Sequence, residues 1–384
     1  MHLLPTVLSA LWLVSAANAA EPTPLEKRAQ CASTLSIAQG LAQELQNKYF
    51  SASSGMYNGG SLWTDANAME DLHNLMLATG TNEFSAVADE SWIGRNALQS
   101  SDTGFWNGIV NGAIDDAAWI VLALWKIADY KINRGLNATP YLNSALTVYN
   151  IVAAQWDPST CGGGVWWSTA HTYKNAITNQ LFLLTSAVGA INFPNQAPFL
   201  ANALKSWAWM EGSGMRNSQG LWNDGLTDAC TNNGQTTWTY NQGVIASGLG
   251  ALYAVTGNSS LLTQAEITLD ATINLLTTND ILRESCDDAA SGGPVCNQDQ
   301  QIFKGLWMKH LQYYLDRAND ASRVAKYAPF IGSQSSAVFH FGTGAGDDVG
   351  SVWYAPNAGG SIFTPKTSTS GLEAQVCAAK YGPC

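Results

Sequence analysis

The chain has 384 residues and a formal net charge of −11, and only 12% of its residues are charged. A nucleic-acid partner requires clustered Lys and Arg to neutralise phosphate, and the sequence has no basic cluster, so nucleic acid is excluded as a partner. The length allows two average domains or one large domain, and the repeat described below favours one.

The N-terminus predicts a secreted protein. Residues 1–19 have an apolar core and end in Ala17-Asn18-Ala19, the small residues of a signal-peptide cleavage site. Lys27-Arg28 resembles a dibasic processing site, so residues 20–28 are a candidate propeptide, with an ordinary solvated pair as the alternative. No later apolar run reaches the roughly 18–20 residues of a membrane span, and no hydrophobic tail precedes the C-terminus. We therefore expect residues 29–384 to form one extracellular domain, acting as a monomer.

The cysteines predict disulfides, because a secreted protein folds in an oxidising compartment. There are seven: Cys31, Cys161, Cys230, Cys286, Cys296, Cys377 and Cys384. Cys286 and Cys296 flank a loop rich in Asp, Gly and Pro, so we predict a bond between them. The other pairings that we consider are Cys161–Cys230 and a bond from Cys31 to Cys377 or Cys384. The odd number leaves one thiol unpaired, and neither the cysteine spacing nor the scattered histidines match a metal site.

The hydrophobic pattern predicts an all-α protein, because strand-like alternation is hard to find. Very apolar helices, each preceded by a loop rich in aromatic and amide residues, are expected at 64–79, 116–132, 173–190, 239–256, 298–316 and 368–380. Amphipathic helices are expected between them at 35–49, 83–97, 140–156, 196–210, 260–278 and 320–327. The repeat of roughly fifty to sixty-five residues fits a helix pair.

This alternation predicts an (α/α)6 barrel. A helix that is apolar on all sides is buried, and a helix with one apolar face covers it. Closing the six pairs into a ring gives six inner helices surrounded by six outer ones. An open solenoid is the alternative, but it would need polar caps at both ends, and the terminal helices are no more polar than the others.

In such a ring the loops before the inner helices emerge on one face and collect aromatic and amide side chains there. Flat aromatic faces stack on sugar rings, and Asn, Gln and Asp bind hydroxyls, so these residues predict a sugar cleft. Packing between loops is the alternative for the tryptophans, and helix capping for the polar residues. The candidate binding residues are Trp63, Asn67, Trp106, Asn107, Trp119, Trp166, Trp167, Tyr173, Asn175, Trp222, Asp224, Trp238, Tyr240, Asn241, Gln242, Gln298 and Asp299.

Asp115 and Asp116 are the candidate catalytic residues, two adjacent carboxylates at the start of an apolar helical run. A helix N-terminus stabilises one anion, which makes capping the alternative role. Two ionised carboxylates side by side raise the pKa of one of them, and a glycosidase needs such a split pair. Neighbouring residues within a regular helix diverge by about 100°, so Asp115 must lie at or before the first turn. Gly112 supplies the backbone freedom for that turn.

Five motifs give the chain a resemblance to glycoside hydrolase family 76, the fungal and bacterial endo-α-1,6-mannanases. They are Ala66-Asn67-Ala68-Met69-Glu70, Ile114-Asp115-Asp116-Ala117-Ala118-Trp119, Tyr173-Lys174-Asn175-Ala176-Ile177-Thr178-Asn179, Thr239-Tyr240-Asn241-Gln242-Gly243 and Asp299-Gln300-Gln301-Ile302-Phe303-Lys304-Gly305. The resemblance implies an (α/α)6 barrel and a retaining mechanism without metal or cofactor. Asp115 would be the nucleophile and Asp116 the general acid/base. Trp119-Ile120 departs from the two tryptophans common after the aspartates in bacterial members, which bears on subsite shape.

From these observations we expect a secreted endo-α-1,6-mannanase that hydrolyses the α-1,6-linked backbone of cell-wall or extracellular mannan. One alternative is a cell-wall transglycosidase that transfers glycan chains from lipid-anchored mannoproteins to wall glucan. A second is a mannan-binding protein without turnover. A third is a barrel with other chemistry, such as an inverting or uronate-processing enzyme, although the scarcity of Arg and Lys in the cleft loops argues against anionic sugars.

Overall fold

The computed structural model describes residues 31–196, 198–287, 292–356 and 360–384. The predicted signal peptide and propeptide lie outside the described residues. Within the described ranges, no helix is long and apolar enough to cross a membrane.

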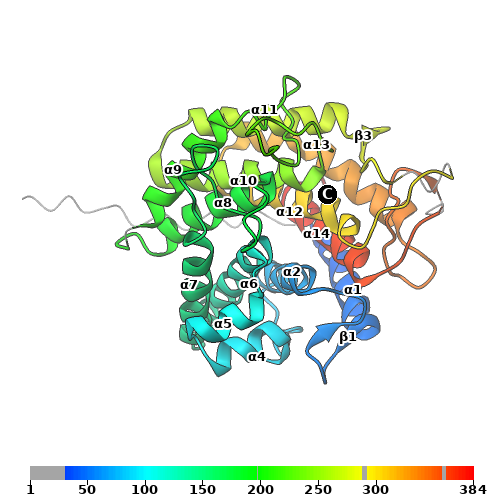
Figure 1. Ribbon diagram of the computed structural model, residues 1–384. Helices are drawn as coiled ribbons and strands as arrows, with labels where there is room; N and C mark the ends of the chain where they lie inside the picture. The colour runs from blue at the N-terminus through cyan, green and yellow to red at the C-terminus, as the bar shows by residue number, and fades with distance from the viewer. Residues whose placement is uncertain (1–30, 197, 288–291, 357–359) are drawn as a thin grey trace, which may run out of the picture.

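In the described part of the chain, six helices form a closed inner ring. They are α2 (Leu62–Thr79), α6 (Ile114–Asn133), α8 (Ala176–Asn192), α10 (Thr239–Thr256), α12 (Phe303–Ala318) and α14 (Pro365–Tyr381). Each packs against the next, and α14 packs against α2, which closes the ring (Figure 1). The closed ring confirms the (α/α)6 barrel and rules out the open solenoid.

The outer layer covers the inner helices. Its long members are α1 (Ala32–Tyr49), α7 (Thr139–Ala153), α9 (Phe199–Gly212), α11 (Ser260–Leu275) and α13 (Ala321–Ala337). Helix α1 packs on α14, α7 on α6, α9 on α8 and α11 on α10, while α13 packs on α14 and α12. Helix α13 continues ten residues beyond the predicted end at 327 and then turns into the π-helix η3 (Val338–Gly342).

The single helix predicted at 83–97 is wrong. The structure has α3 (Val87–Glu90) and α4 (Trp92–Gln99), separated by the extended backbone of Ser91, whose hydroxyl accepts a hydrogen bond from the amide of Gly94 and so starts α4. A further short helix, α5 (Thr103–Val110), occupies residues that we assigned to a loop.

Two inner helices begin later than predicted. Helix α8 starts at Ala176 because the Asn175 side chain caps it through the amide of Thr178. Helix α12 starts at Phe303, after the 3₁₀ turn η2 (Gln300–Ile302). Among the described residues strands form only two-residue ladders, β1 (Phe50–Ser51) with β2 (Met56–Tyr57) and β3 (Thr277–Thr278) with β4 (Ile281–Leu282).

A buried charge cluster joins the helices where the ring closes. The Nζ atom of Lys309 on α12 lies 3.0 Å from Oε2 of Glu70 on α2 and 2.9 Å from Oε1 of Glu373 on α14. It also donates to Oδ1 of Asn67 at 2.6 Å. Burial opposes the charge of Lys309, yet the two glutamates hold the pKa of Lys309 above its usual value. The cluster therefore remains ionic inside the barrel.

We expect Lys309→Met to lower the free energy of unfolding by about 3–5 kcal/mol, because it leaves two buried carboxylates without their cation. Urea unfolding followed by tryptophan fluorescence measures the change. The matched control is Lys326→Met. Lys326 is 40% exposed and pairs with Glu266 and Asp270 on the outer layer, so its loss should cost only about 0–1 kcal/mol. Equal midpoints for both variants would contradict the role of the cluster.

Candidate active site

The two adjacent aspartates lie in the first turn of an inner helix. Asp115 and Asp116 are the second and third residues of α6, in its first turn. Ala113 precedes the helix and has no polar side chain to cap it. The Asp115 carboxylate instead accepts the backbone amides of Asp115 and Asp116. One aspartate is thus held by the helix end, and its neighbour is not.

The chain enters α6 through a tight turn beside a second loop. Asn111 ends α5 with a φ of 46°, and Gly112 follows with a φ of 80°. A Cβ atom on Gly112 would lie 2.4 Å from Oγ1 of Thr169, so only glycine fits. The amide of Ile114 donates to the carbonyl of Trp167 at 3.1 Å. This backbone pairing brings the Trp167 side chain against Asp115.

Trp167 donates its indole Nε1–H to Oδ2 of Asp115 at 2.9 Å. Burial raises the pKa of Asp115, and the Trp167 and backbone hydrogen bonds lower it again, leaving it at about 6. Burial, followed by the charges of Asp115 and Asp299, raises the pKa of Asp116 to about 7. Hydrogen bonds to a carboxylate favour its charged form, so the first proton leaves Asp115 and the second stays on Asp116.

An aromatic wall stands beside the pair. The Trp63 indole on α2 donates to Oδ1 of Asp299 at 3.2 Å and stacks on Trp119 with ring centroids 5.9 Å apart. Phe303 lies next to Trp63 and stacks face to face on Tyr240, with centroids 3.8 Å apart. Trp238 packs edge-on against Phe303 at 5.6 Å. Side chains from the N-terminal turns of four inner helices, α2, α6, α10 and α12, therefore meet here.

Tyr173, Asp224 and Asn233 form a hydrogen-bonded polar group in the same site. The hydroxyl of Tyr173 donates to Oδ2 of Asp224 at 2.5 Å and accepts from Nδ2 of Asn233 at 2.8 Å. Burial raises the pKa of Tyr240, and the negative charges of Asp224, Asp115 and Asp299 raise it further. These carboxylates therefore share one site around Tyr240.

Other predicted residues serve the scaffold instead. Trp106 and Trp222 are fully buried and donate to the Ser100 carbonyl and to Oγ1 of Thr268. The prediction that they contact a sugar is therefore wrong. Both are packing residues, because their rings are buried and offer no surface to a sugar. Trp106 and Asn107 lie on α5, and Asn107 is exposed.

The buried amides among the predicted residues have structural partners or sit inside the ring. Gln242 bonds the backbone of Trp222 and Trp238, and Asn67 holds Lys309. Asn175 caps α8, and Asn241 and Trp119 are buried inside the ring. For these side chains other than Asn241 we replace sugar contact by a supporting role. The Asn241 amide is buried without a hydrogen-bond partner, so its contact with a sugar stays a prediction.

Two predicted residues sit in neighbouring loops and keep partly open surfaces. Trp166 stacks on His171 with centroids 5.4 Å apart and carries the Lys174 ammonium over its ring. Gln298 is exposed, and its Oε1 accepts from Nζ of Lys366 at 3.4 Å.

Three site residues were missed by the sequence analysis. Phe303 and Asn233 are described above. Lys366 is a buried residue at the start of α14; burial lowers the pKa of Lys366, and the negative charges of Asp299 and Asp65 oppose that shift. Phe303 belongs to a motif that we noted, but its place in the aromatic wall follows only from its contacts with the rings of Trp63, Trp238 and Tyr240. Lys366 lies next to the loops that we described as poor in cations.

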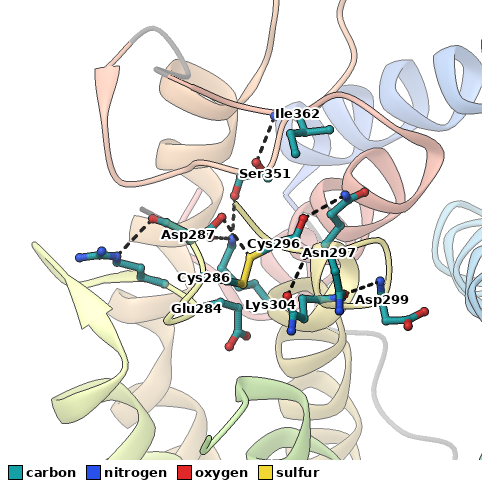
Figure 2. The surroundings of a disulfide bond; sticks show 12 residues. Glu284, Cys286, Asp287, Cys296, Asn297, Asp299, Lys304, Ser351 and Ile362 are labelled. Carbon is teal, nitrogen blue, oxygen red and sulfur yellow. Dashed lines mark hydrogen bonds and ion pairs between the residues drawn. A yellow bond between two sulfur atoms is a disulfide. The ribbon is translucent and has the colours of Figure 1, made fainter. Parts of the chain in front are cut away.

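Two disulfides hold the loops of this face. Cys286–Cys296 was predicted, and Cys161–Cys230 was one of the pairings that we considered. Cys161–Cys230 has a Cα–Cα distance of 5.2 Å and joins the loop of Trp167 to the loop of Asp224. Cys286–Cys296, with a Cα–Cα distance of 4.7 Å, closes the loop before Asp299 (Figure 2). Asn297 then fixes the turn, because its Oδ1 accepts the amides of Asp299 at 2.9 Å and Gln300 at 3.0 Å.

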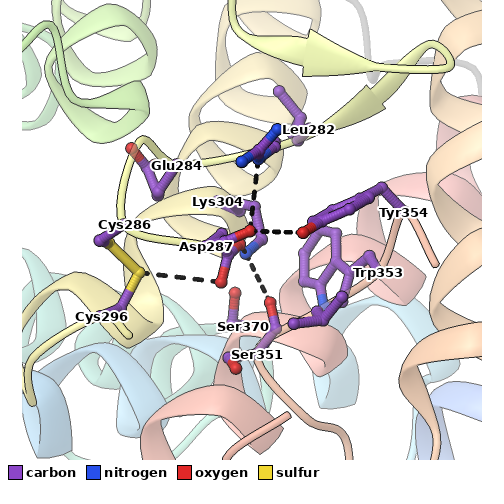
Figure 3. Close-up of polar contacts among 12 residues, drawn as sticks. Leu282, Glu284, Cys286, Asp287, Cys296, Lys304, Ser351, Trp353, Tyr354 and Ser370 are labelled. Atoms are coloured by element: carbon purple, nitrogen blue, oxygen red, sulfur yellow. Dashed lines mark hydrogen bonds and ion pairs between the residues drawn. A yellow bond between two sulfur atoms is a disulfide. The ribbon is translucent and has the colours of Figure 1, made fainter. Parts of the chain in front are cut away.

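The Cys286–Cys296 loop is anchored to the barrel by buried charges (Figure 3). Asp287 forms an ion pair with Lys304 of α12, and Lys304 also donates to the Ser351 carbonyl at 2.7 Å. The Tyr354 hydroxyl donates to the Asp287 carbonyl at 2.7 Å. Glu284 accepts the amide of Thr239 at 3.2 Å at the start of α10. The loop is thus tied to two inner helices.

Within the described ranges, no three His, Cys, Asp or Glu side chains are grouped so that they could hold a metal ion. Cys31, Cys377 and Cys384 are free thiols in the structure, so neither bond that we considered for Cys31 is present.

The closed double ring of helices, with a carboxylate pair and aromatic rings at one end, defines an (α/α)6 barrel of the glycosidase type. The profile of glycosyl hydrolase family 76 matches residues 31–381, and the chain belongs to this family. The carboxylate pair therefore lies within the matched region.

Curated relatives agree with this family. A putative mannan endo-1,6-α-mannosidase of Schizosaccharomyces pombe is 29% identical over 259 residues, which are 64% of this chain and 57% of the relative. The mannan endo-1,6-α-mannosidase DCW1 of Saccharomyces cerevisiae is 30% identical over 210 residues, 52% of this chain and 45% of the relative. The chain thus spans about half the length of the curated relatives it matches.

Solved structures show the same fold. Dfg5 of Chaetomium thermophilum in complex with glucosamine has a TM-score of 0.77 at 16% identity, over 92% of each chain. An inactive variant of an α-1,6-mannanase of Salegentibacter sp. HEL1_6, with two consecutive aspartates changed to asparagine and α-1,6-mannotriose bound, has a TM-score of 0.75 at 18% identity. It covers 90% of this chain, and this chain covers 99% of it.

We expect Trp167→Phe to raise the lower carboxyl pKa of the pair, because the variant removes a hydrogen bond that stabilises ionised Asp115. Carbon-13 NMR of labelled aspartate carboxyl groups, followed against pH, measures both values. Trp166→Phe is the control, since Trp166 packs on His171 and Lys174 in the same loop. An unchanged titration in Trp167→Phe would show that the indole does not hold Asp115.

Proposed function

We propose that this protein hydrolyses α-1,6-linked mannan with retention of configuration. The observation that carries the proposal is the split carboxylate pair, with Asp115 held ionised by Trp167 and the helix end and Asp116 kept protonated by burial and its negative neighbours. Family membership supports the reaction class. The Salegentibacter mannanase, whose inactive variant lacks two consecutive aspartates and binds α-1,6-mannotriose, supports the pair and the substrate.

The reaction would proceed by double displacement. An Asp115 oxygen attacks the anomeric carbon while the Asp116 carboxyl gives its proton to the departing glycosidic oxygen. This forms a mannosyl ester on Asp115 and releases the shortened chain. Asp116, now ionised, takes a proton from water as that water attacks the anomeric carbon and frees Asp115. Two inversions retain the α configuration.

The surrounding residues suit a neutral sugar chain. Trp167 is 44% exposed beside Asp115 and offers an aromatic face for a pyranose ring. Asp224 and Asp299 can accept hydrogen bonds from sugar hydroxyls, and their charges, with that of Asp115, all act on Tyr240. The Lys366 ammonium donates to Gln298 and lies near the negative charges of Asp299 and Asp65, which offset its positive charge.

We also infer that the protein works outside the cell. The two disulfides are typical of proteins that fold in an oxidising compartment. The glycosylation sequons at Asn137 and Asn258 are exposed and follow inner helices α6 and α10, at the end of the barrel away from the aspartates. Glycans there would leave the cleft open.

The substrate test is incubation of the purified protein with linear α-1,6-mannan, with products separated by chromatography and their configuration read by early-time NMR. We expect short α-configured oligomannosides, and at least a 10³-fold loss of activity in Asp115→Asn. Retained mannan binding without turnover would identify a binding protein. Products that appear only when an acceptor glycan is added would identify a transglycosidase.

Azide distinguishes the roles of the two aspartates. With an activated aryl α-mannoside, Asp116→Ala should be rescued by azide to give an α-mannosyl azide, because Asp115 still forms the ester. Asp115→Gly with azide should give the β-mannosyl azide, because the anion attacks once from the nucleophile's side. The opposite stereochemistry would exchange the two roles.

The pH dependence follows from the pair. We expect kcat/KM to rise with an apparent pKa of about 6 and to fall with one of about 7, since Asp115 must be ionised and Asp116 protonated. Asp299→Asn removes a negative charge that raises both values, so both limbs should move to lower pH. The control is Asp280→Asn, an exposed residue in the β3–β4 turn. A profile unmoved by Asp299→Asn would exclude this electrostatic effect.

A further inference from the structure

The two ends of the described domain meet on the outside of the ring. Cys31 lies directly before α1, and its amide donates to the carbonyl of Ala379 on α14 at 2.9 Å. Helix α14 ends at Tyr381. The chain then passes Pro383, which contacts α13 closely enough that a Cβ on Gly332 would lie 2.7 Å from the Pro383 ring. Cys384 follows Pro383 directly.

The thiols of Cys31 and Cys384 are hydrogen-bonded to each other. Cys31 is buried and also has Oγ of Ser33 at 3.2 Å from its sulfur. The Cys384 thiol, followed by Ser33 and Thr34, lowers the pKa of Cys31 to about 6. Cys31 also stands at the N-cap of α1. A helix N-terminus and hydrogen bonds to the sulfur favour the thiolate form, as at reactive cysteines.

The third free cysteine, Cys377, differs from Cys31 in its location and in the direction of its pKa shift. Cys377 is fully buried on the inner helix α14, and burial raises its pKa well above the usual value. A group that is protonated and shielded in this way does not attack a disulfide. Of the two partners that the sequence allowed for Cys31, the structure therefore favours Cys384 over Cys377.

We propose that Cys31 and Cys384 form a third disulfide in the oxidised protein, joining the start of α1 to the end of α14, and that Cys377 stays a free thiol. The bond would tie the first and last helices together beside the seam where α14 meets α2. Because it closes a loop of nearly the whole domain, it removes much freedom from the unfolded chain.

The bond forms by exchange with an external disulfide, either oxidised glutathione or a disulfide oxidoreductase. The Cys31 thiolate attacks one sulfur of that disulfide and releases the other as a thiolate, which gives a mixed disulfide. Cys384 then loses its proton and attacks the sulfur of Cys31, releasing the second thiolate. Two protein thiols are oxidised, and one external disulfide is reduced to two thiols.

The test is to incubate the full chain with oxidised glutathione, unfold it without reduction in the presence of iodoacetamide, and map the peptides by mass spectrometry. We expect a linked peptide containing residues 31 and 384, with alkylation only at Cys377. Alkylation of all three cysteines, or a peptide joining Cys31 to Cys377, would overturn the proposal. Cys384→Ser should expose Cys31 to alkylation.

Thermal unfolding gives a second readout. We expect Cys31→Ser and Cys384→Ser each to lower Tm by about 5 °C, and the double variant to lower it no further, because each removes the same bond. Cys377→Ala is the matched control, and its effect should add to that of Cys31→Ser. Additive losses for Cys31→Ser and Cys384→Ser would contradict a shared bond, as would equal Tm values for oxidised and reduced protein.

Discussion

The structure depends on one buried cation. Lys309 reaches from α12 to Glu70 on α2 and Glu373 on α14, the first and last inner helices. An ion buried in a low-dielectric interior must be paired, so α2 and α14 can close the ring only in the register that brings both glutamates to this ammonium. The same contact fixes Asn67 and hence the first turns of α2, where Trp63 begins the aromatic wall. Barrel closure and site geometry are thus set together.

The site depends on the balance between burial and hydrogen-bond donors. Burial raises the pKa values of Asp115, Asp116 and Asp224, and the outcome differs because the hydrogen-bond donors differ. Asp115 has an indole and two amides, whereas Asp116 faces only the negative charges of Asp115 and Asp299. Asp224 has the Tyr173 hydroxyl. Two neighbours in sequence therefore acquire different pKa values from their different hydrogen bonds and charged neighbours. Such a difference suits the division of roles in the double displacement that we propose.

The features that were predictable from the sequence are those that a single segment determines. Helices α6, α8 and α10 are rich in apolar residues around their whole circumference. The Asp115–Asp116 pair lies in the first turn of α6, next to the apolar run that predicts this helix. The short helix α5 and the roles of Trp106 and Trp222 were not predictable, because a tryptophan in an aromatic-rich segment does not reveal which of its faces is covered. Phe303 and Lys366 gain their roles from rings and carboxylates on other helices. Those contacts exist only after the ring has closed.

The two ends of the barrel differ in their capacity to form a binding site, because the loops at one end are long and those at the other end are short. Helices α10 and α11, and α12 and α13, are joined by two or three residues, which leaves little chain for binding. The connections into α8, α10, α12 and α14, at 154–175, 213–238, 276–302 and 343–364, are long. They meet at the helix N-termini, whose amides favour negative charge. Long loops cost backbone entropy, and the two disulfides within them offset part of that cost. A carboxylate-rich site is therefore stable at this end and would be unfavourable at the other, where the helix C-termini converge.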